Sequence, residues 1–151
     1  MKLSFLLCLF FLAGLQSNAQ TAEDSVKAAV VKLFDAMKQN DSASLIAAFT
    51  KNAVLQSISK DANGLVAKNE SVTDFAGSIS RAPKGSLDER ISFATVKVDG
   101  SLASVWTPYS FYFNGGFSHC GVNSFQLLRT AAGWKIHYLI DTRRKTGCDN
   151  Q

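Results

Sequence analysis

Histidine, cysteine and glycine occupy successive positions in the stretch FSHCGVNSF, residues 117–125. An imidazole beside a thiol can support nucleophilic catalysis or ligate a metal. A glycine within a strand permits another chain segment to approach closely. Three interpretations of His119-Cys120-Gly121 are therefore open: a chemical site, a disulfide anchor, or ordinary packing.

The cysteine count favours the disulfide. The chain has three cysteines, and Cys8 lies in an apolar N-terminal segment that export would remove. The remaining pair, Cys120 and Cys148, is an even number in an exported protein, which favours one bridge over a nucleophilic thiol. Two histidines and two cysteines without a recognised zinc spacing predict no metal site, and no cofactor motif is present.

Residues 1–19 have the organisation of a signal peptide. Lys2 gives a positive start, Leu3 to Leu15 form an apolar run too short to span a membrane, and Ser17-Asn18-Ala19 provides small residues for cleavage. We expect cleavage after Ala19, a secreted or periplasmic location, and no membrane association of the mature form. Residues 20–151 then make one domain.

The charge of the chain does not indicate nucleic-acid binding. There are 16 basic and 12 acidic residues, and loss of Lys2 with the signal peptide lowers the net charge from +4 to +3. The basic residues are scattered apart from Arg143-Arg144-Lys145, which is typical of a solvated strand end. No nucleic-acid partner is expected.

Hydrophobic periodicity predicts the helices and strands that carry these side chains. Residues 21–39 predict a helix with a buried stripe of Val26, Val30, Leu33 and Met37, and Thr21 is its expected N-cap. Asn40-Asp41 begins a short second helix, a hairpin turns at Asn63-Gly64, and Ser71 caps a third helix that ends near Pro83.

Four strands complete the chain as an antiparallel meander, at residues 91–98, 102–113, 117–129 and 134–142. Pro108 requires an edge position or a bulge in the second of them. Helices followed by such a sheet predict an α+β domain. A long twisted sheet curled around a helix leaves a cone-shaped hollow.

Pairing the last two strands across Ala131-Ala132 predicts which side chains share a face. The expected pairs are Arg129 with Lys135, Leu127 with His137, Phe125 with Leu139, Asn123 with Asp141, and Gly121 with Arg143. His119 continues this mixed face, which resembles a pocket wall. The opposite face carries Val122, Leu128, Trp134, Ile136, Tyr138 and Ile140.

Asp141 is the candidate acid–base residue. A carboxyl group in a partly apolar pocket is suited to act as a general base, with His119 or His137 as its partner. Asp141 can equally be a polar anchor that pairs with Arg143 or bonds to Asn123. Three aromatic residues on the neighbouring strand can donate to a ligand or simply pack: Trp106, Tyr109 and Tyr112.

The chain resembles the nuclear transport factor 2-like superfamily, and in particular its small exported bacterial members of the putative lumazine-binding or SnoaL-like type. The resemblance rests on VKLFDAMKQND, VWTPYSFYFNGGFSHCGVNSFQLLRT and GWKIHYLIDTRR, and it covers nearly all of the mature chain. It implies a cone-shaped, cystatin-like fold of three helices on a strongly curved antiparallel sheet, with Asp141 facing into the cone.

The leading functional hypothesis is a non-enzymatic domain that holds a small apolar or aromatic molecule in the cone. The predicted ligand-binding residues are Trp106, Tyr109, Tyr112, His119, Asn123, Phe125, His137 and Asp141. The alternatives are an isomerase or dehydratase, in which Asp141 acts with His119 or a tyrosine, and a protein-interaction adaptor. The apolar opposite face predicts a homodimer, because leaving it in water forfeits several kcal/mol at roughly 25 cal/mol per Å².

Overall fold

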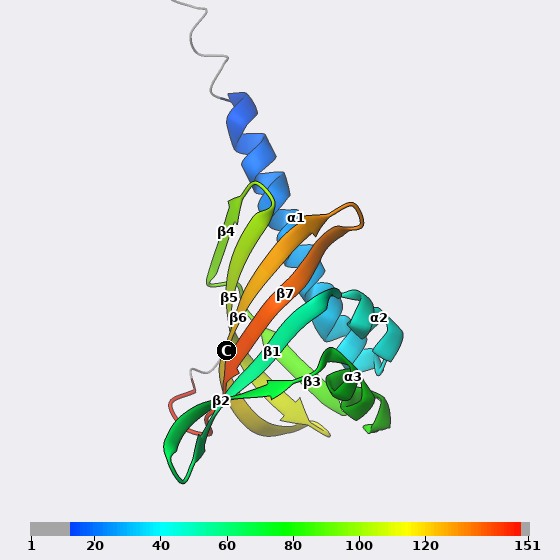
Figure 1. Ribbon diagram of the computed structural model, residues 1–151, viewed down its shortest axis with the longest axis vertical. Helices are drawn as coiled ribbons and strands as arrows, with labels where there is room; N and C mark the ends of the chain where they lie inside the picture. Colours follow the sequence, from blue (N-terminus) through cyan, green and yellow to red (C-terminus); the bar gives the residue numbers. More distant parts are fainter. Residues whose placement is uncertain (1–12, 149–151) are drawn as a thin grey trace, which may run out of the picture.

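The structure is a computed structural model that describes residues 13–148. Most of the predicted signal peptide, residues 1–12, lies outside the described residues. The first helix, α1, spans Ala13–Gln39 and runs across the sheet, with its N-terminal turns projecting past the sheet edge (Figure 1). Thr21 therefore lies inside α1, and its expected role as the N-cap is wrong.

The predicted stripe of α1 is buried. Val26, Val30, Leu33 and Met37 are all in the hydrophobic core, and α1 contacts β3, β4 and β7. The spacing of the stripe places these side chains on one helical face, so their burial against the sheet fixes the helix orientation.

Two shorter helices follow, and side-chain caps begin both. Helix α2 spans Ser42–Ala47, with Asp41 accepting from the amide of Ser44, and α3 spans Val72–Arg81, with Ser71 accepting from the amide of Asp74. Asn40 adopts a positive φ of 57° where α1 ends. Its side-chain amide donates to the carbonyls of Ile79 and Ala82, which ties the end of α1 to the end of α3.

The seven strands form one mixed sheet. Their bounds are β1 Phe49–Asp61, β2 Gly64–Glu70, β3 Leu87–Ile91, β4 Thr95–Asp99, β5 Leu102–Phe113, β6 Gly116–Thr130 and β7 Gly133–Thr142. The order is β2-β1-β7-β6-β5-β3, with β4 also paired to β5 (Figure 1). Only β1 and β7 run parallel, and the path from β2 to β3 stays open. The α+β architecture predicted from the sequence is confirmed.

The strand expected at residues 91–98 is two strands. β3 ends at Ile91 and β4 begins at Thr95, and both pair with β5 on the same side. The break lies opposite Pro108, whose carbonyl accepts from Ser92 and whose nitrogen has no hydrogen to donate to a ladder. The edge position or bulge expected at Pro108 is wrong, because β5 is a central strand that pairs with β6 in continuous register there; the facing strand is divided instead.

The pairing of β6 with β7 is as predicted at one end and shifted at the other. Asn123 pairs with Asp141 and Phe125 with Leu139, but Leu127 pairs with Ile136 instead of His137. An extra residue of β7 is inserted at this point, which reverses the side-chain alternation of the preceding residues. The expected pairs Leu127–His137 and Arg129–Lys135 are wrong.

Because of this bulge, two residues predicted for the outer face of the sheet lie on its inner face instead. Trp134 and Ile136 turn toward α1 and belong to the core, where Ile136 is fully buried and the Trp134 indole donates to Ser25 at 3.1 Å. The other side still carries four half-buried residues: Val122, Leu128, Tyr138 and Ile140.

Among the described residues, none of the helices combines the length and the apolar composition that a membrane-spanning helix requires.

Candidate functional site

A cavity of about 160 Å³ lies between the helices and the concave face of the sheet. Its apolar wall comes from α1, α3 and four strands, and consists of Leu33, Phe34, Met37, Leu55, Phe75, Ile79, Leu87, Phe111 and Leu139. Its polar end comes from the strands and the residue after β7, and contains Ser57, Glu70, Glu89, Tyr109, His119, Asn123, Asp141 and Arg143. The cavity thus has an apolar part and a hydrogen-bonding part.

Asp141 lies at the centre of a hydrogen-bonded network at this polar end. It is 8% exposed, and its carboxylate accepts from the Arg143 guanidinium at 2.7 Å, from the Ser57 hydroxyl, and from Tyr109 at 3.4 Å. Arg143 also donates to Ser57 at 3.0 Å. These contacts are those of a polar anchor, the second of the two roles that the sequence leaves open for Asp141.

Glu89 lies on the cavity wall outside this network. It is half-buried on β3 and lines the cavity, and one of its oxygens accepts from the Asn123 amide at 2.7 Å. Burial raises the pKa of Glu89 to about 7, the Asn123 hydrogen bond opposes that rise, and the nearby negative charge of Asp141 adds to it. A carboxyl group with such a pKa exchanges its proton at neutral pH, which is the property required of a general base.

His119 lies on the cavity wall among aromatic rings. Its imidazole packs against Tyr109 and Phe111, with ring centroids 5.7 and 5.0 Å away. Its Nδ1 shares a hydrogen bond of 3.1 Å with the Ser118 hydroxyl. Burial and the positive charge of Arg143 lower the pKa of His119 below 6.5, the ordinary value for histidine. The ring is therefore mostly neutral above pH 6.5.

The Tyr109 hydroxyl is hydrogen-bonded within the protein and does not offer a free donor to a ligand. Its hydroxyl donates to the Thr142 carbonyl at 2.9 Å, and burial together with the charge of Asp141 raises its pKa above the ordinary value. The phenol therefore stays protonated, and its proton is already directed at the protein. We conclude that Tyr109 positions the end of β7 beside the cavity.

Four of the predicted ligand-binding residues lie away from the cavity. Phe125 is fully buried in the core against Phe34, and Trp106 is 48% exposed. Tyr112 packs against Phe117 and under the Arg90 guanidinium. His137, at the β7 bulge, bonds to Thr50 at 2.9 Å. The cavity brings together Tyr109, His119, Asn123 and Asp141 from the predicted set.

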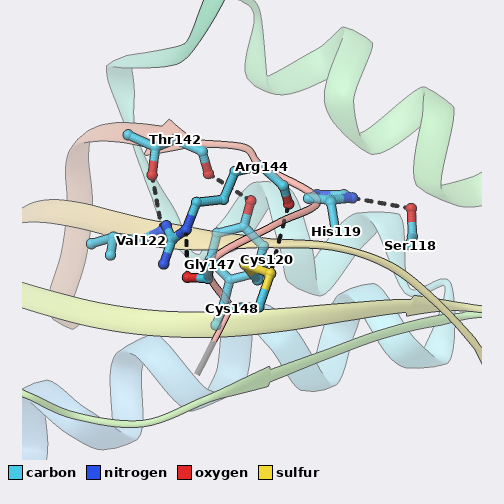
Figure 2. Close-up of a disulfide and its surroundings, with 9 residues drawn as sticks. Ser118, His119, Cys120, Val122, Thr142, Arg144, Gly147 and Cys148 are labelled. Carbon is cyan, nitrogen blue, oxygen red and sulfur yellow. Dashed lines mark hydrogen bonds between the residues drawn. A yellow bond between two sulfur atoms is a disulfide. The ribbon is translucent and has the colours of Figure 1, made fainter. Parts of the chain in front are cut away.

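The disulfide and the glycine of the opening stretch are structural. Cys120 and Cys148 form the predicted bridge, which holds the segment after β7 against β6 beside His119 (Figure 2). A Cβ atom on Gly121 would lie 1.8 Å from the Thr142 carbonyl oxygen, so only glycine permits this approach of β6 and β7. Of the three residues, His119 alone faces the cavity. No group of three potential metal ligands occurs in the described part of the chain.

Sequence reasoning missed Glu89, Ser57 and Glu70. Glu89 lies in the alternating stretch Leu87-Asp88-Glu89-Arg90-Ile91, in which two apolar residues flank it at a spacing of two. That pattern places Glu89 on the same face as its buried neighbours, and so it could have identified an inward-facing carboxyl group. Ser57 reaches the site through the parallel pairing of β1 with β7, which no local pattern predicts.

No family model matches the sequence, and no curated protein matches it. Solved structures do resemble it. A nuclear transport factor 2-like protein of unknown function from Shewanella baltica superposes with a TM-score of 0.63 at 16% identity, over 82% of this chain and 94% of that chain. A candidate dehydratase of the same family from Streptomyces avermitilis gives a TM-score of 0.64 at 18% identity, over 83% and 97%.

A ketosteroid isomerase-like protein from Erwinia carotovora atroseptica gives a TM-score of 0.59 at 16% identity, over 80% of this chain and 95% of that chain. Identities this low carry information about architecture and none about chemistry. The shared features are helices packed on a curved, open, mixed sheet. The chain therefore has the nuclear transport factor 2-like, or cystatin-like, fold.

Proposed function

We propose that the protein binds a small, largely apolar molecule in the cavity between the helices and the sheet. The observation that carries this proposal is the division of the cavity into an apolar wall and a polar end. Ligand sites in proteins have this composition, in which apolar contacts supply affinity and a few polar groups fix orientation. Glu89 and Asn123 are the polar groups in the best position to orient a ligand.

The cavity volume sets the size of the ligand. A cavity of about 150 Å³ lined by apolar side chains is known to hold benzene. The present cavity, at about 160 Å³, accommodates a molecule with one ring. Lumazine has two fused rings, so the volume favours a smaller ligand than the lumazine-binding resemblance implies.

Filling the cavity should abolish binding. Met37 points from α1 into the cavity, and Met37→Trp should occupy the space at a cost of roughly 1–3 kcal/mol in stability. Native mass spectrometry after incubation with a metabolite extract should show a small-molecule adduct on the wild type and none on Met37→Trp.

Val31→Trp is the matched control, because Val31 lies on the same helix but is 39% exposed and does not line the cavity. It should retain the adduct. A wild-type protein without any adduct, or an adduct retained by Met37→Trp, would contradict binding in the cavity.

A second candidate function is proton transfer, as in an isomerase or dehydratase. The observation that favours it is the Glu89 pKa of about 7, which suits a general acid–base group at neutral pH. Two of the structural neighbours are described as a candidate dehydratase and as ketosteroid isomerase-like. Glu89 replaces Asp141 as the proposed base, because the contacts of Asp141 to Arg143 and Ser57 occupy its oxygens.

Hydrogen–deuterium exchange at the α-carbon of cyclohexanone tests this second candidate. The Glu89 carboxylate would take an α-hydrogen as a proton, and the enolate would regain a deuteron that Glu89 draws from D2O. Wild type should accelerate the exchange over buffer and Glu89→Gln should not. Equal rates for the wild type, the variant and buffer would exclude Glu89 as a base for this class of substrate.

We also propose export with cleavage after Ala19, and a homodimer in solution. The disulfide supports export, because such bridges persist in oxidising compartments. For the dimer, Val54 and Trp106 are exposed on the same sheet face as Ile140. An adaptor would present this face to a different protein. The mass of the mature chain tests cleavage, and sedimentation at micromolar concentration tests the dimer, which a clean monomer would exclude.

A further inference from the structure

The charge of the cavity wall is opposite to that of the chain. The whole chain carries a net charge of +4, yet the wall contains three carboxyl groups, Glu70, Glu89 and Asp141, and one guanidinium, Arg143. Arg143 is already paired with Asp141 at 2.7 Å. An anionic ligand would meet two carboxylates and no free cation, so the wall excludes anions.

Two of these carboxyl groups, Glu70 and Glu89, form no ion pair within the described residues, and of the two only Glu89 is half-buried. The only side chain that donates to Glu89 in the described structure is the neutral Asn123 amide, at 2.7 Å to one oxygen. The other carboxyl oxygen has no hydrogen-bond partner in the described structure. This carboxyl group is partly removed from water and lines the cavity, so a cation bound in the cavity would find a favourable partner in its ionised form.

Three aromatic rings line the same cavity as Glu89. Phe111 is the residue paired with Glu89 across β3 and β5, His119 packs against Phe111, and Tyr109 packs against His119. The negative faces of aromatic rings attract ammonium groups. A carboxylate together with aromatic rings is therefore suited to a ligand that is both apolar and positively charged.

We propose that the cavity binds a small primary amine of single-ring size, with its ammonium group on Glu89 and its ring against the apolar wall. This inference rests on the proposed binding function and specifies its ligand class. Asn123 orients the Glu89 carboxylate toward the ammonium group. The ring contacts Leu33 and Met37 on α1 and Phe75 on α3.

Proton release should accompany binding of the amine. The other charged or titratable groups that line the cavity with Glu89 are Asp141 on β7, Arg143 after it, Tyr109 on β5, His119 on β6 and Glu70 on β2. Helices α1 and α3 contribute only apolar residues to the wall. The pKa of Tyr109 is raised above its ordinary value, and the pKa of His119 is lowered below its ordinary value. Because the pKa of Glu89 is about 7, ionisation of Glu89 dominates between pH 6 and pH 8.

Three probes of one shape and different charge test the inference: benzylamine, benzyl alcohol and benzoate. Their dissociation constants are measured by NMR titration at pH 6 and pH 8. Benzylamine, protonated at both values, should bind most tightly and should gain about tenfold in affinity from pH 6 to pH 8, because only the ionised fraction of Glu89 is competent. Benzoate should not bind.

Glu89→Gln should remove both the preference for benzylamine and its pH dependence. Asp88→Asn is the matched control, since Asp88 is the adjacent residue of β3 but pairs with Lys38 and Arg90 and does not line the cavity. It should retain both properties.

Tighter binding of benzyl alcohol than of benzylamine would overturn the amine inference and leave binding in the cavity intact. Absence of binding by all three probes would also overturn it. Native mass spectrometry with the metabolite extract tests the wider proposal separately. An adduct on the wild type that Met37→Trp abolishes would support binding in the cavity even if no amine binds. Absence of an adduct from the wild type would contradict the binding function as well.

Discussion

Glu89→Gln should make the protein more stable above pH 7, by up to about 3 kcal/mol. The folded state raises the pKa of Glu89 from 4.5 to about 7, chiefly through burial. Below pH 4.5 the group is protonated in both states and contributes no difference. Between pH 4.5 and 7 the unfolded chain loses the proton while the folded chain keeps it, so stability falls as the pH rises. Glutamine remains neutral and avoids this loss.

Urea unfolding of the wild type and Glu89→Gln at pH 4 and pH 8 measures the effect. The curves should nearly coincide at pH 4 and separate at pH 8. Asp88→Asn should behave in the opposite way and destabilise at pH 8, because Lys38 and Arg90 hold the pKa of Asp88 below its ordinary value. A Glu89→Gln variant that is less stable than wild type at pH 8 would show that the carboxylate stabilises the fold.

Loss of the disulfide should lower the free energy of unfolding by about 3–4 kcal/mol, from the chain entropy of the closed loop. The bridge joins residues 28 positions apart, and it fixes the segment after β7 to β6. Cys148→Ala removes the bridge and leaves the thiol of Cys120, which is 2% exposed, as a small apolar side chain.

Reductant supplies the control for this variant. Dithiothreitol should lower the stability of wild type by a similar amount and should leave Cys148→Ala unchanged. Equal urea midpoints for the oxidised wild type and Cys148→Ala would show that the bridge contributes nothing to stability.

Much of the fold follows from local patterns in the sequence. The stripe of α1 has the period of an amphipathic helix, Ser71 caps α3, and Asn63-Gly64 and Asp99-Gly100 close hairpins. Cysteine counting predicted the bridge. The pairing of Asn123 with Asp141 was also predicted, which placed His119, Asn123 and Asp141 on the concave face.

The remaining features of the fold and the site depend on contacts between residues far apart in the sequence, which local patterns do not predict. The bulge of β7 places Trp134 and Ile136 in the core, and no turn signal in the sequence marks it. Hydrogen-bond partners distinguish Glu89 from Asp141: Glu89 has only an amide as its side-chain donor, and Asp141 has a guanidinium and two hydroxyls. A one-dimensional pattern identifies a carboxyl group on a face, but three-dimensional contacts decide whether it is an anchor or an ionisable site.

The proposals for ligand and proton both depend on Glu89, a cavity-lining carboxyl group whose pKa burial raises to about 7. Carbon NMR of selectively labelled glutamate and aspartate side chains measures this directly, with Glu89→Gln assigning the resonance. We expect a Glu89 midpoint near 7, while Asp88 titrates below its ordinary 3.8. A Glu89 midpoint at its ordinary value of 4.5 would rule out both roles of Glu89 at neutral pH, because the carboxyl group would then behave as a solvated surface group.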